Sequence, residues 1–382
     1  MYFNVRISLK MLRAMGLNPF YHHRITSKIL FYFGLFALLA NLYLGTLLFI
    51  YEKHLTIANV ITSLEAIFLT IHVLVKYTVL YKNSHLIRSL IEDTELFWSL
   101  EESSSEDEKN NALSYLTRFK LMFIYYLSFG SFTSMFFTLN PILSGQRILP
   151  LTSYVPEYPP YTILFIVEEC AYCAIFFLII PFDTIVGSLT ILTAMQWKLL
   201  NGRFQEILNR IVDTPEDKVM LQKELGKCVD HHNFLIRYVS RLNDALFFAL
   251  APYVLIIVVS NCSELFIISL SPPTPLLIKC ITYVIALLNE YIMFYCIPGQ
   301  ILTVEAEKTV QYIFASKWYA NSSCLKKPII NIVTMMSRRQ IGINVSKIMN
   351  LNFENMLKSF RMIISYYMFL KTLELSRNEG DS

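Results

Sequence analysis

Hydrophobic residues along the chain are gathered into seven long stretches separated by polar segments. Each stretch approaches or exceeds the roughly 20 residues that a helix needs to cross a hydrocarbon layer. Because lipid offers no hydrogen-bond partners to backbone N–H and C=O groups, each stretch is predicted to be helical. The pattern predicts an all-α membrane protein with seven transmembrane helices, at about 29–50, 57–81, 120–140, 161–195, 245–270, 276–302 and 351–373.

The lengths of these stretches and the residues between them refine the prediction. Residues 271–275, Ser-Pro-Pro-Thr-Pro, are a short turn that joins the fifth and sixth spans as a hairpin. The 161–195 stretch is too long for a bilayer at 1.5 Å per residue, so it should project on one side, with a kink at Pro181. The seventh stretch is the weakest, because it carries Glu354, Lys358, Arg361 and Lys371.

Composition excludes several classes of protein. Only 16% of the 382 residues are charged and 54% are hydrophobic, whereas soluble domains carry about 25% charged residues. The chain is therefore neither a soluble enzyme nor a disordered protein. A net charge of +4 is too small for a nucleic-acid-binding surface. No phosphate-binding loop, H-E-x-x-H or G-x-S-x-G motif is present, so we expect no catalytic residue and no cofactor.

The basic residues predict the orientation in the membrane. The first 28 residues hold five Lys and Arg residues and no acid, which favours a cytoplasmic N-terminus. With seven spans, segments 82–118, 196–241 and 303–350 then lie on the same side, and together these four regions hold 24 of the 33 basic residues. The C-terminus is predicted to be extracellular, the reverse of a G-protein-coupled receptor.

The inner segments have patterns of their own. Residues 101–109 are acidic and of low complexity, typical of a flexible loop, and residues 11–20 form an amphipathic interfacial segment. His22-His23 and His231-His232 fall in polar stretches, where we expect solvated histidines rather than metal ligands. Helical continuations below the membrane are predicted for 304–340 and for 203–241, where apolar residues recur at Ile207, Ile211, Val219, Leu225 and Val229. Such continuations bind partner subunits or pack within one chain.

The cysteines do not form a recognisable framework. The seven are odd in number and widely scattered, unlike a set of disulfides. Cys170 and Cys173 lie inside an apolar stretch, where packing in the core is a better interpretation than a redox or metal site. Cys262 and Cys280 flank a short loop, and whether they pair is left open. Asn261-Cys-Ser263 is a glycosylation sequon too close to lipid for modification.

Polar side chains inside the spans are costly in lipid and indicate a polar network or a watery cavity between helices. Hydrogen bonding between helices for structure alone is an equal alternative. Glu264 and Lys279 lie near span ends and are expected to reach the interface. The residues deeper in the spans are His72 and Lys76 in the second, Glu168, Glu169 and Asp183 in the fourth, and Asn289 and Glu290 in the sixth.

Aromatic residues are concentrated in the outer halves of several spans. A pocket between such helices would be apolar with a few hydroxyl groups, and would suit a small volatile molecule with one or two polar atoms. Lipid contact or core packing is the alternative for each residue. The candidate ligand-binding residues are Phe68, His72, Phe129, Phe132, Thr133, Phe136, Tyr172, Phe176, Tyr283 and Tyr291.

The last span carries a polar stripe of Lys358, Arg361, Ser365 and Thr372 on an otherwise apolar helix. Such a stripe can face water if several copies of the helix surround an axis. Phe369 and Leu373 lie one turn apart beside its outer end, where rings of apolar side chains would form a constriction. Ser365, Phe369, Thr372 and Leu373 are therefore the candidate pore and gate residues. Packing against a polar neighbour in the same chain is the alternative.

Short stretches of the C-terminal third form a recognisable series. They are Phe294-Tyr-Cys-Ile-Pro-Gly-Gln-Ile-Leu302 with Glu305, Ala315-Ser-Lys-Trp-Tyr319, Met336-Ser-Arg-Arg-Gln340 and Ser365-Tyr-Tyr-Met-Phe-Leu370. In their order and spacing, this part of the chain resembles the insect odorant receptor family. The resemblance covers residues 290–373 in detail, and the layout of apolar stretches extends it over the whole chain. The N-terminal Met-Gly-Leu-Asn-Pro run is similar to the family's opening.

The resemblance implies a ligand-gated, non-selective cation channel, with an odorant pocket in the outer half of spans two, three, four and six. It implies a tetramer formed with the odorant receptor co-receptor through cytoplasmic anchor helices, in the plasma membrane of olfactory neuron dendrites. The 196–241 segment lacks the co-receptor's long insertion, so the chain resembles an odorant-binding subunit. The implied regions are 1–28 (amphipathic), 29–302 (spans one to six), 303–350 (anchor), 351–375 (pore helix) and 376–382 (extracellular tail).

Other assignments stay open from the sequence. The related gustatory receptors, which form homotetramers, carry a Thr-Tyr-(five apolar)-Gln signature, and here Ser365-Tyr366 is followed by Thr372 in place of Gln. Cations at Lys358, Arg361 and Lys371 would repel cations in a homomeric pore, so partner subunits should supply most of the conducting surface. A G-protein-coupled receptor and a transporter are further alternatives.

Overall fold

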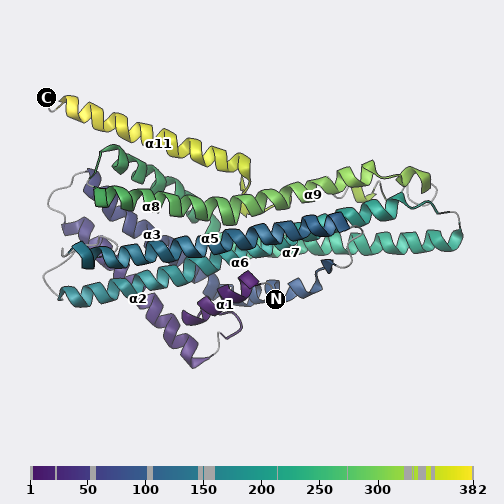
Figure 1. Cartoon of the computed structure of the whole chain (residues 1–382), viewed down its shortest axis with the longest axis horizontal. Helices are drawn as coiled ribbons and strands as arrows, with labels where there is room; N and C mark the ends of the chain where they lie inside the picture. Colours follow the sequence, from purple (N-terminus) through teal and green to yellow (C-terminus); the bar gives the residue numbers. More distant parts are fainter. Residues whose placement is uncertain are drawn as a thin grey trace.

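The computed structural model of the chain is a long bundle of helices that lie side by side (Figure 1). It describes residues 3–21, 24–51, 57–100, 106–144, 149, 160–212, 214–272, 274–321, 329, 331–333, 341–345 and 349–380. Within these residues, the long helices are α2 (Ile25–Tyr51), α3 (Ile57–Lys82), α5 (Glu106–Ser144), α6 (Tyr161–Asn209), α7 (Pro215–Ser269), α8 (Thr274–Glu290), α9 (Ile297–Ala315) and α11 (Phe353–Gly380). A π-helix, η3 (Tyr291–Cys296), joins α8 to α9 without a break, so the eight form seven continuous helical segments.

Shorter elements cover the sides and one end of the bundle. The helices α1 (Phe3–Ala14) and α4 (Ser84–Asp93) precede the 3-10 turn η1 (Thr94–Leu96), and a second 3-10 turn, η4 (Trp318–Asn321), follows α9. Two short strands, β1 (Asn344–Val345) and β2 (Met349–Asn350), pair antiparallel with Asn344 opposite Asn350.

Six of the described helical segments are long and apolar enough to cross a membrane. They correspond to the first six predicted spans. The seventh predicted span corresponds to α11, which is not among the six because its charged side chains dilute the apolar ones. The helix itself exists as expected, and it extends beyond the predicted end of the span to Gly380.

The helices are longer than the apolar stretches that predicted them. At 1.5 Å per residue, the 49 residues of α6 and the 55 of α7 extend about 74 and 82 Å, more than twice a hydrocarbon core. The expected projection beyond the bilayer is therefore confirmed, and α6 continues as a helix through Pro181. A short connection between the fifth and sixth spans is also confirmed, since α7 ends at Ser269 and α8 begins at Thr274, so that Thr274 and Pro275 belong to the helix rather than to the turn.

The far halves of α6 and α7, together with α9, form a helical extension at the end of the bundle where α6 turns into α7 (Figure 1). Asn201 joins two of these helices, because its amide donates to the Glu305 carbonyl at 2.8 Å and its oxygen accepts from Thr309 at 2.6 Å. Ile207 and Leu225 are buried as the periodicity predicts, whereas Ile211 and Val219 are exposed near the turn. Near the turn between α6 and α7, no third helix within the described residues covers the outer side of the pair, so apolar side chains there stay exposed.

The N-terminal segment packs on protein. The apolar face of α1, with Val5, Leu9 and Leu12, is buried against the bundle, and α6 is its main neighbour. Asn18 fixes the end of this segment, since its side-chain amide donates to the Leu9 carbonyl at 2.6 Å. The amphipathic helix therefore lies at Phe3–Ala14 rather than at the predicted residues 11–20, and its apolar face packs on α6.

Several expectations for polar residues are wrong. His231 and His232 are buried, because Trp98, and Trp197 of α6, pack over this part of α7. His231 stacks on Trp98 and its Nε2 lies 3.1 Å from Gln196 Oε1. Residues 106–109 are the first turn of α5 rather than loop. Residues 101–105, His22-His23, Cys324 and Met336–Gln340 lie outside the described residues.

The cysteine predictions are corrected in one place. Cys173 is exposed on α6 rather than packed in the core, and Cys170 is half-buried. Cys262 and Cys280 are both buried and both free, so they do not pair. Asn261 is buried as well, which agrees with a sequon that is not modified.

Candidate functional site

A cavity lies between α3, α5, α6 and α8, in the half of the bundle nearer the α7–α8 turn. It contains about 810 Å³ of space that atoms do not fill, part of it open to the surroundings. Each helix presents one face to it, at the three- and four-residue spacing of an α-helix. On α5, for example, the lining residues are Tyr126, Phe129, Gly130, Thr133 and Phe137.

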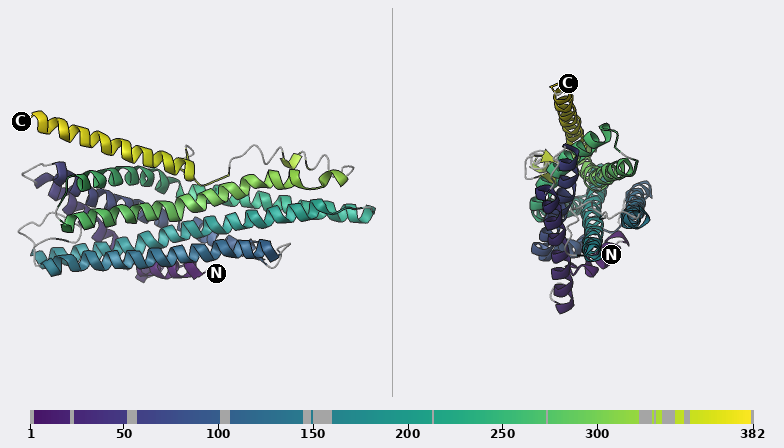
Figure 2. Two further views of the ribbon diagram at one scale, coloured as in Figure 1. Left: turned by 45° about the horizontal axis from the view of Figure 1, so that its top comes forward. Right: turned by 90° about the vertical axis from the view of Figure 1, so that its left-hand side faces the viewer.

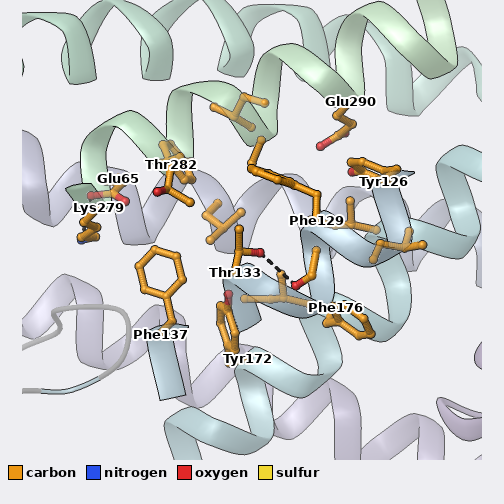
Figure 3. A pocket seen from close by; sticks show the side chains of 18 residues that line it. Glu65, Tyr126, Phe129, Thr133, Phe137, Tyr172, Phe176, Lys279, Thr282 and Glu290 are labelled. Atoms are coloured by element: carbon orange, nitrogen blue, oxygen red, sulfur yellow. Dashed lines mark hydrogen bonds and ion pairs between the residues drawn. The ribbon is translucent and has the colours of Figure 1, made fainter. Parts of the chain in front are cut away.

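The walls of the cavity are mainly aromatic and aliphatic. Phe129, Phe137, Tyr172 and Phe176 surround its centre (Figure 3). The ring of Phe137 contacts that of Tyr172, with 5.8 Å between centroids. Thr133 provides a hydroxyl on this wall, although it donates a hydrogen bond to the Gly130 carbonyl at 2.9 Å. Such a surface binds an apolar molecule and fixes its orientation through a few polar atoms.

Charged residues line the two ends of the cavity rather than its centre (Figure 3). At one end, Lys279 on α8 pairs with Glu65 on α3, with 2.9 Å between Nζ and Oε2. Glu290, the last residue of α8, lines the opposite end beside Tyr126. Glu264 and Lys279 are both buried, so the expectation that they reach the interface is wrong. Lys279 is held inside because Glu65 provides its counter-ion there.

Glu290 also belongs to a buried ionic network beside its end of the cavity. Lys76 Nζ lies 2.6 Å from Asp183 Oδ1 and 2.6 Å from Glu290 Oε1, and it bridges the two carboxylates. His72 Nε2 lies 3.3 Å from the same Glu290 oxygen, and the Tyr295 hydroxyl donates to Asp183. The polar network predicted from these spans is therefore confirmed for His72, Lys76, Asp183 and Glu290. A lysine between two carboxylates keeps the desolvated charges paired.

The structure brings together half of the candidate ligand-binding residues. Phe129, Thr133, Tyr172, Phe176 and Tyr283 line the cavity. The other five do not: His72 lies in the ionic network, Tyr291 is buried against α11, Phe132 is 68% exposed on the outside of α5, and Phe68 and Phe136 are half-buried elsewhere. Contact with a ligand stays a prediction for all ten.

Sequence reasoning did not select thirteen of the residues that line the cavity. Most of them could be predicted once one lining residue of a helix is known, because positions three or four residues apart lie on the same face of a helix. Glu65 and Lys279 have no such signal, since the pairing of two distant helices decides their position. The thirteen are Glu65, Leu69, Tyr126, Gly130, Phe137, Ile175, Ile179, Ile180, Lys279, Thr282, Ala286, Leu287 and Glu290.

The candidate pore and gate residues lie on α11, which projects from one side of the bundle (Figure 2). Ser365, Phe369, Thr372 and Leu373 are all exposed there. The other side of α11 packs on α7 and η3, and Tyr367 and Leu370 contact a small buried cluster of Phe266, Ile267 and Cys280. The exposed side is thus available to another molecule.

The site shows no catalytic arrangement. Within the part of the chain that the structure describes, no cluster of three or more His, Cys, Asp or Glu side chains could hold a metal ion. Each charged group that lines the cavity is paired, Lys279 with Glu65, and Glu290 with Lys76 of the ionic network. The arrangement can bind a small molecule and respond to it.

Known proteins resemble the chain in sequence and in structure. The family model described as "7tm Odorant receptor" matches residues 56–364. "Odorant receptor 10" of Aedes albopictus is 22% identical over 300 residues, 77% of this chain and 79% of that protein. "Odorant receptor Or2" of Anopheles gambiae is 23% identical over 265 residues, 67% of this chain and 70% of that protein.

Solved structures share the fold. The olfactory receptor OR5 of Machilis hrabei in complex with eugenol superposes with a TM-score of 0.81 over 97% of both chains, at 14% identity. A second structure of the same receptor superposes with a TM-score of 0.77 over 91% of this chain and 90% of that one, at 13% identity. Seven helical segments, α11 included, therefore belong to the shared fold.

Proposed function

Because the chain belongs to the insect odorant receptor family, we propose that it is the odorant-binding subunit of a heteromeric, ligand-gated, non-selective cation channel formed with the odorant receptor co-receptor. The family consists of receptors, so the chain is not an enzyme. The observation that carries the proposal is the pairing of an aromatic cavity inside the bundle with a helix, α11, whose outer face is exposed beside it.

The chemistry of the cavity supports a small, volatile, largely apolar ligand. Its lining offers aromatic and aliphatic contact together with the hydroxyl groups of Thr133, Tyr172 and Tyr283. Its charges lie at the two ends (Figure 3). The name of the Machilis structure states that its receptor binds eugenol, a molecule of this general kind. For this chain the proposal assigns direct ligand contact to Phe129, Thr133, Tyr172, Phe176 and Tyr283.

The exposed face of α11 supports assembly into a tetramer. Four such helices around an axis would place Phe369 and Leu373 in a constriction, with Ser365 and Thr372 beside the path of the ions. Lys358 and Arg361 are also exposed on α11, so co-receptor subunits would supply much of the conducting surface. The exposed apolar residues Ile211 and Val219 at the tip of the extension support contact between subunits there.

The distribution of basic residues supports a cytoplasmic N-terminus and extension, and an extracellular C-terminus. Membership of the odorant receptor family supports a location in the plasma membrane of the olfactory neuron dendrite. In this orientation the cavity lies in the outer half of the membrane. An epitope tag on each terminus, detected on unpermeabilised cells, tests the orientation. A tag exposed at the N-terminus would indicate the reverse topology of a G-protein-coupled receptor.

The experiment that tests the proposal is current recording from cells that express the chain with the co-receptor. A panel of volatile alcohols, esters, aldehydes, terpenoids and phenols, with eugenol included, should contain activators. Currents from the chain without the co-receptor would indicate a homomeric channel instead. Assembly at the surface without a response to any odorant of a broad panel would contradict the proposal.

Two phenylalanines three residues apart on α5, Phe129 and Phe132, provide a matched test of the cavity. Phe129→Ala should raise the half-maximal concentration of the strongest activator in the panel by about 10-fold or more, since a buried aromatic side chain contributes about 1.5–3 kcal/mol of apolar contact. Phe132→Ala should change it less than about threefold, because Phe132 points away from the cavity. Dose–response curves at equal surface expression measure both; equal shifts would remove the cavity as the binding site.

The proposed constriction predicts a change in leak. Phe369→Ala removes an exposed ring from the narrowest part of the proposed pore, and it should raise current in the absence of odorant about threefold or more. Tyr366→Ala, a similar truncation of an exposed aromatic residue on the same helix, is the control for surface delivery. Unchanged leak in Phe369→Ala at normal surface expression would show that this subunit does not contribute that side chain to the gate.

A further inference from the structure

The wall of the cavity formed by α8 continues directly into a contact with α11. Glu290 lines the cavity, and the next residue, Tyr291, is buried with its hydroxyl 3.2 Å from Ser359 Oγ on α11. Ser359 donates its own proton to the Asn355 carbonyl at 3.1 Å. The two hydroxyl groups, either of which can donate, form a hydrogen bond between the two helices. Two consecutive residues thus contact the ligand cavity and the proposed pore helix.

The segment that holds Tyr291 is the π-helix η3, which extends to Cys296. π-Helical turns inside α-helices are rare in proteins, but those that occur are often at functional sites. If such a turn converts to an α-helix, the register of the residues beyond it shifts. Both faces of η3 are fixed by the residues around the cavity. Phe294 packs on Tyr126, which lines the cavity, with 4.7 Å between ring centroids, and Tyr295 donates to Asp183 of the ionic network.

The contact with Ser359 stands out among those of α11. Within the described residues, the other side-chain hydrogen bonds of this helix beyond Ser359 stay inside the helix, as from Thr372 to the Met368 carbonyl. Ser359 itself is fully buried, whereas most residues that follow it are exposed. A displacement of η3 is therefore transmitted to α11 at Ser359, near the start of the helix.

We propose that Tyr291 is a positioning residue that couples the ligand in the cavity to the pore helix through its hydrogen bond to Ser359. A ligand that contacts the α8 wall changes the position of Glu290, and η3 transmits this change to α11. Tyr291 does not line the cavity, so its hydroxyl acts on gating rather than on ligand contact. This inference rests on the proposed function of the chain as an odorant-gated subunit.

A double-mutant cycle tests the coupling. Tyr291→Phe, Ser359→Ala and the double variant are expressed with the co-receptor and compared by dose–response curves to the strongest activator of the odorant panel. Each single variant should shift the half-maximal concentration about threefold to tenfold in the same direction, since each removes the same hydrogen bond. The double variant should shift it no further than either single one. Current without odorant should change together with these shifts.

Tyr238→Phe is the matched control, because Tyr238 is also a buried tyrosine whose hydroxyl donates a hydrogen bond, to the Leu90 carbonyl at 3.0 Å, far along α7 from the cavity. It should leave the half-maximal concentration unchanged at equal surface expression. If Ser359→Ala does not reach the surface, Ser359→Cys replaces it, since a thiol is a weak hydrogen-bond acceptor of similar size. Additive shifts, or no shift in Tyr291→Phe, would overturn the coupling while the response of the unmodified chain stands. No response in the unmodified chain would overturn the proposed function itself.

Discussion

Replacing Lys76 with methionine should prevent most of the protein from reaching the cell surface. Lys76 is buried between Asp183 and Glu290, and its ammonium also lies 5.0 Å from the centre of the Tyr253 ring. Methionine keeps much of the volume but leaves two carboxylates in the interior without their shared cation. Breaking a buried ion pair by removing one partner destabilises a protein by about 3–5 kcal/mol. We therefore expect a large fall in surface expression and in thermal stability in detergent.

Lys358→Met is the control for the loss of a lysine. Lys358 pairs with Glu354 at 2.6 Å, one turn away on the exposed surface of α11, where solvent screens the pair and it contributes little to stability. Its thermal stability should be close to that of the unmodified protein. Adding Asp183→Asn and Glu290→Gln to Lys76→Met should recover part of the loss, because the uncompensated charges are removed. Normal stability of Lys76→Met alone would show that the network does not hold the helices together.

Replacing Gly299 with alanine should detach the start of α11 from α9. A Cβ atom at Gly299 would lie 2.1 Å from the Leu351 carbonyl oxygen, so the backbone before α11 would have to move. The same segment is held by Gln300, whose Oε1 accepts from the Phe353 backbone N–H at 3.0 Å. In an ordinary helix, alanine would be more stable than glycine by about 1 kcal/mol. Here the clash outweighs this gain, and we expect a net loss of about 1–3 kcal/mol with reduced odorant-activated current.

Gly226→Ala on α7 separates this steric effect from helix propensity. Nothing lies within 4 Å of a Cβ atom built at Gly226, which is exposed in the middle of its helix. This variant should be as stable as the unmodified protein or more stable by up to about 1 kcal/mol. Thermal unfolding of the two variants in detergent, with surface expression alongside, measures the difference. Equal behaviour would mean that the close approach of α9 and Leu351 is dispensable.

The positions of the long helices could be predicted because the constraint on them is local. Lipid requires about 20 apolar residues per span and satisfied backbone groups, and both requirements are visible in a single stretch of sequence. The length of α6 and α7 could be predicted only in part. Ile207 and Leu225 show helical periodicity beyond the apolar stretch, but the burial of His231 and His232 depends on Trp98 and Trp197 from elsewhere in the chain.

For the cavity, the sequence predicted the types of residue that line it but not which residues of each type do so. Phe129 and Phe132 are both aromatic residues in the same predicted span, and one lines the cavity while the other faces outward. The rotation of α5 about its axis separates them, and this rotation is set by packing against α6 and α8. Lys279 and Glu65 are 214 residues apart in the sequence, so no spacing rule could pair them.

The sequence by itself determined the class of protein, the spans and the family, because apolar length, charge bias and short motifs are properties of contiguous residues. It also indicated that charges inside the spans form a network. Only the tertiary structure decided which charges pair, which faces of the helices enclose the cavity, and that Tyr291 joins the cavity wall to α11. These contacts connect helices that are far apart along the chain, and the packing of the whole bundle selects them from many combinations that satisfy the same local pattern.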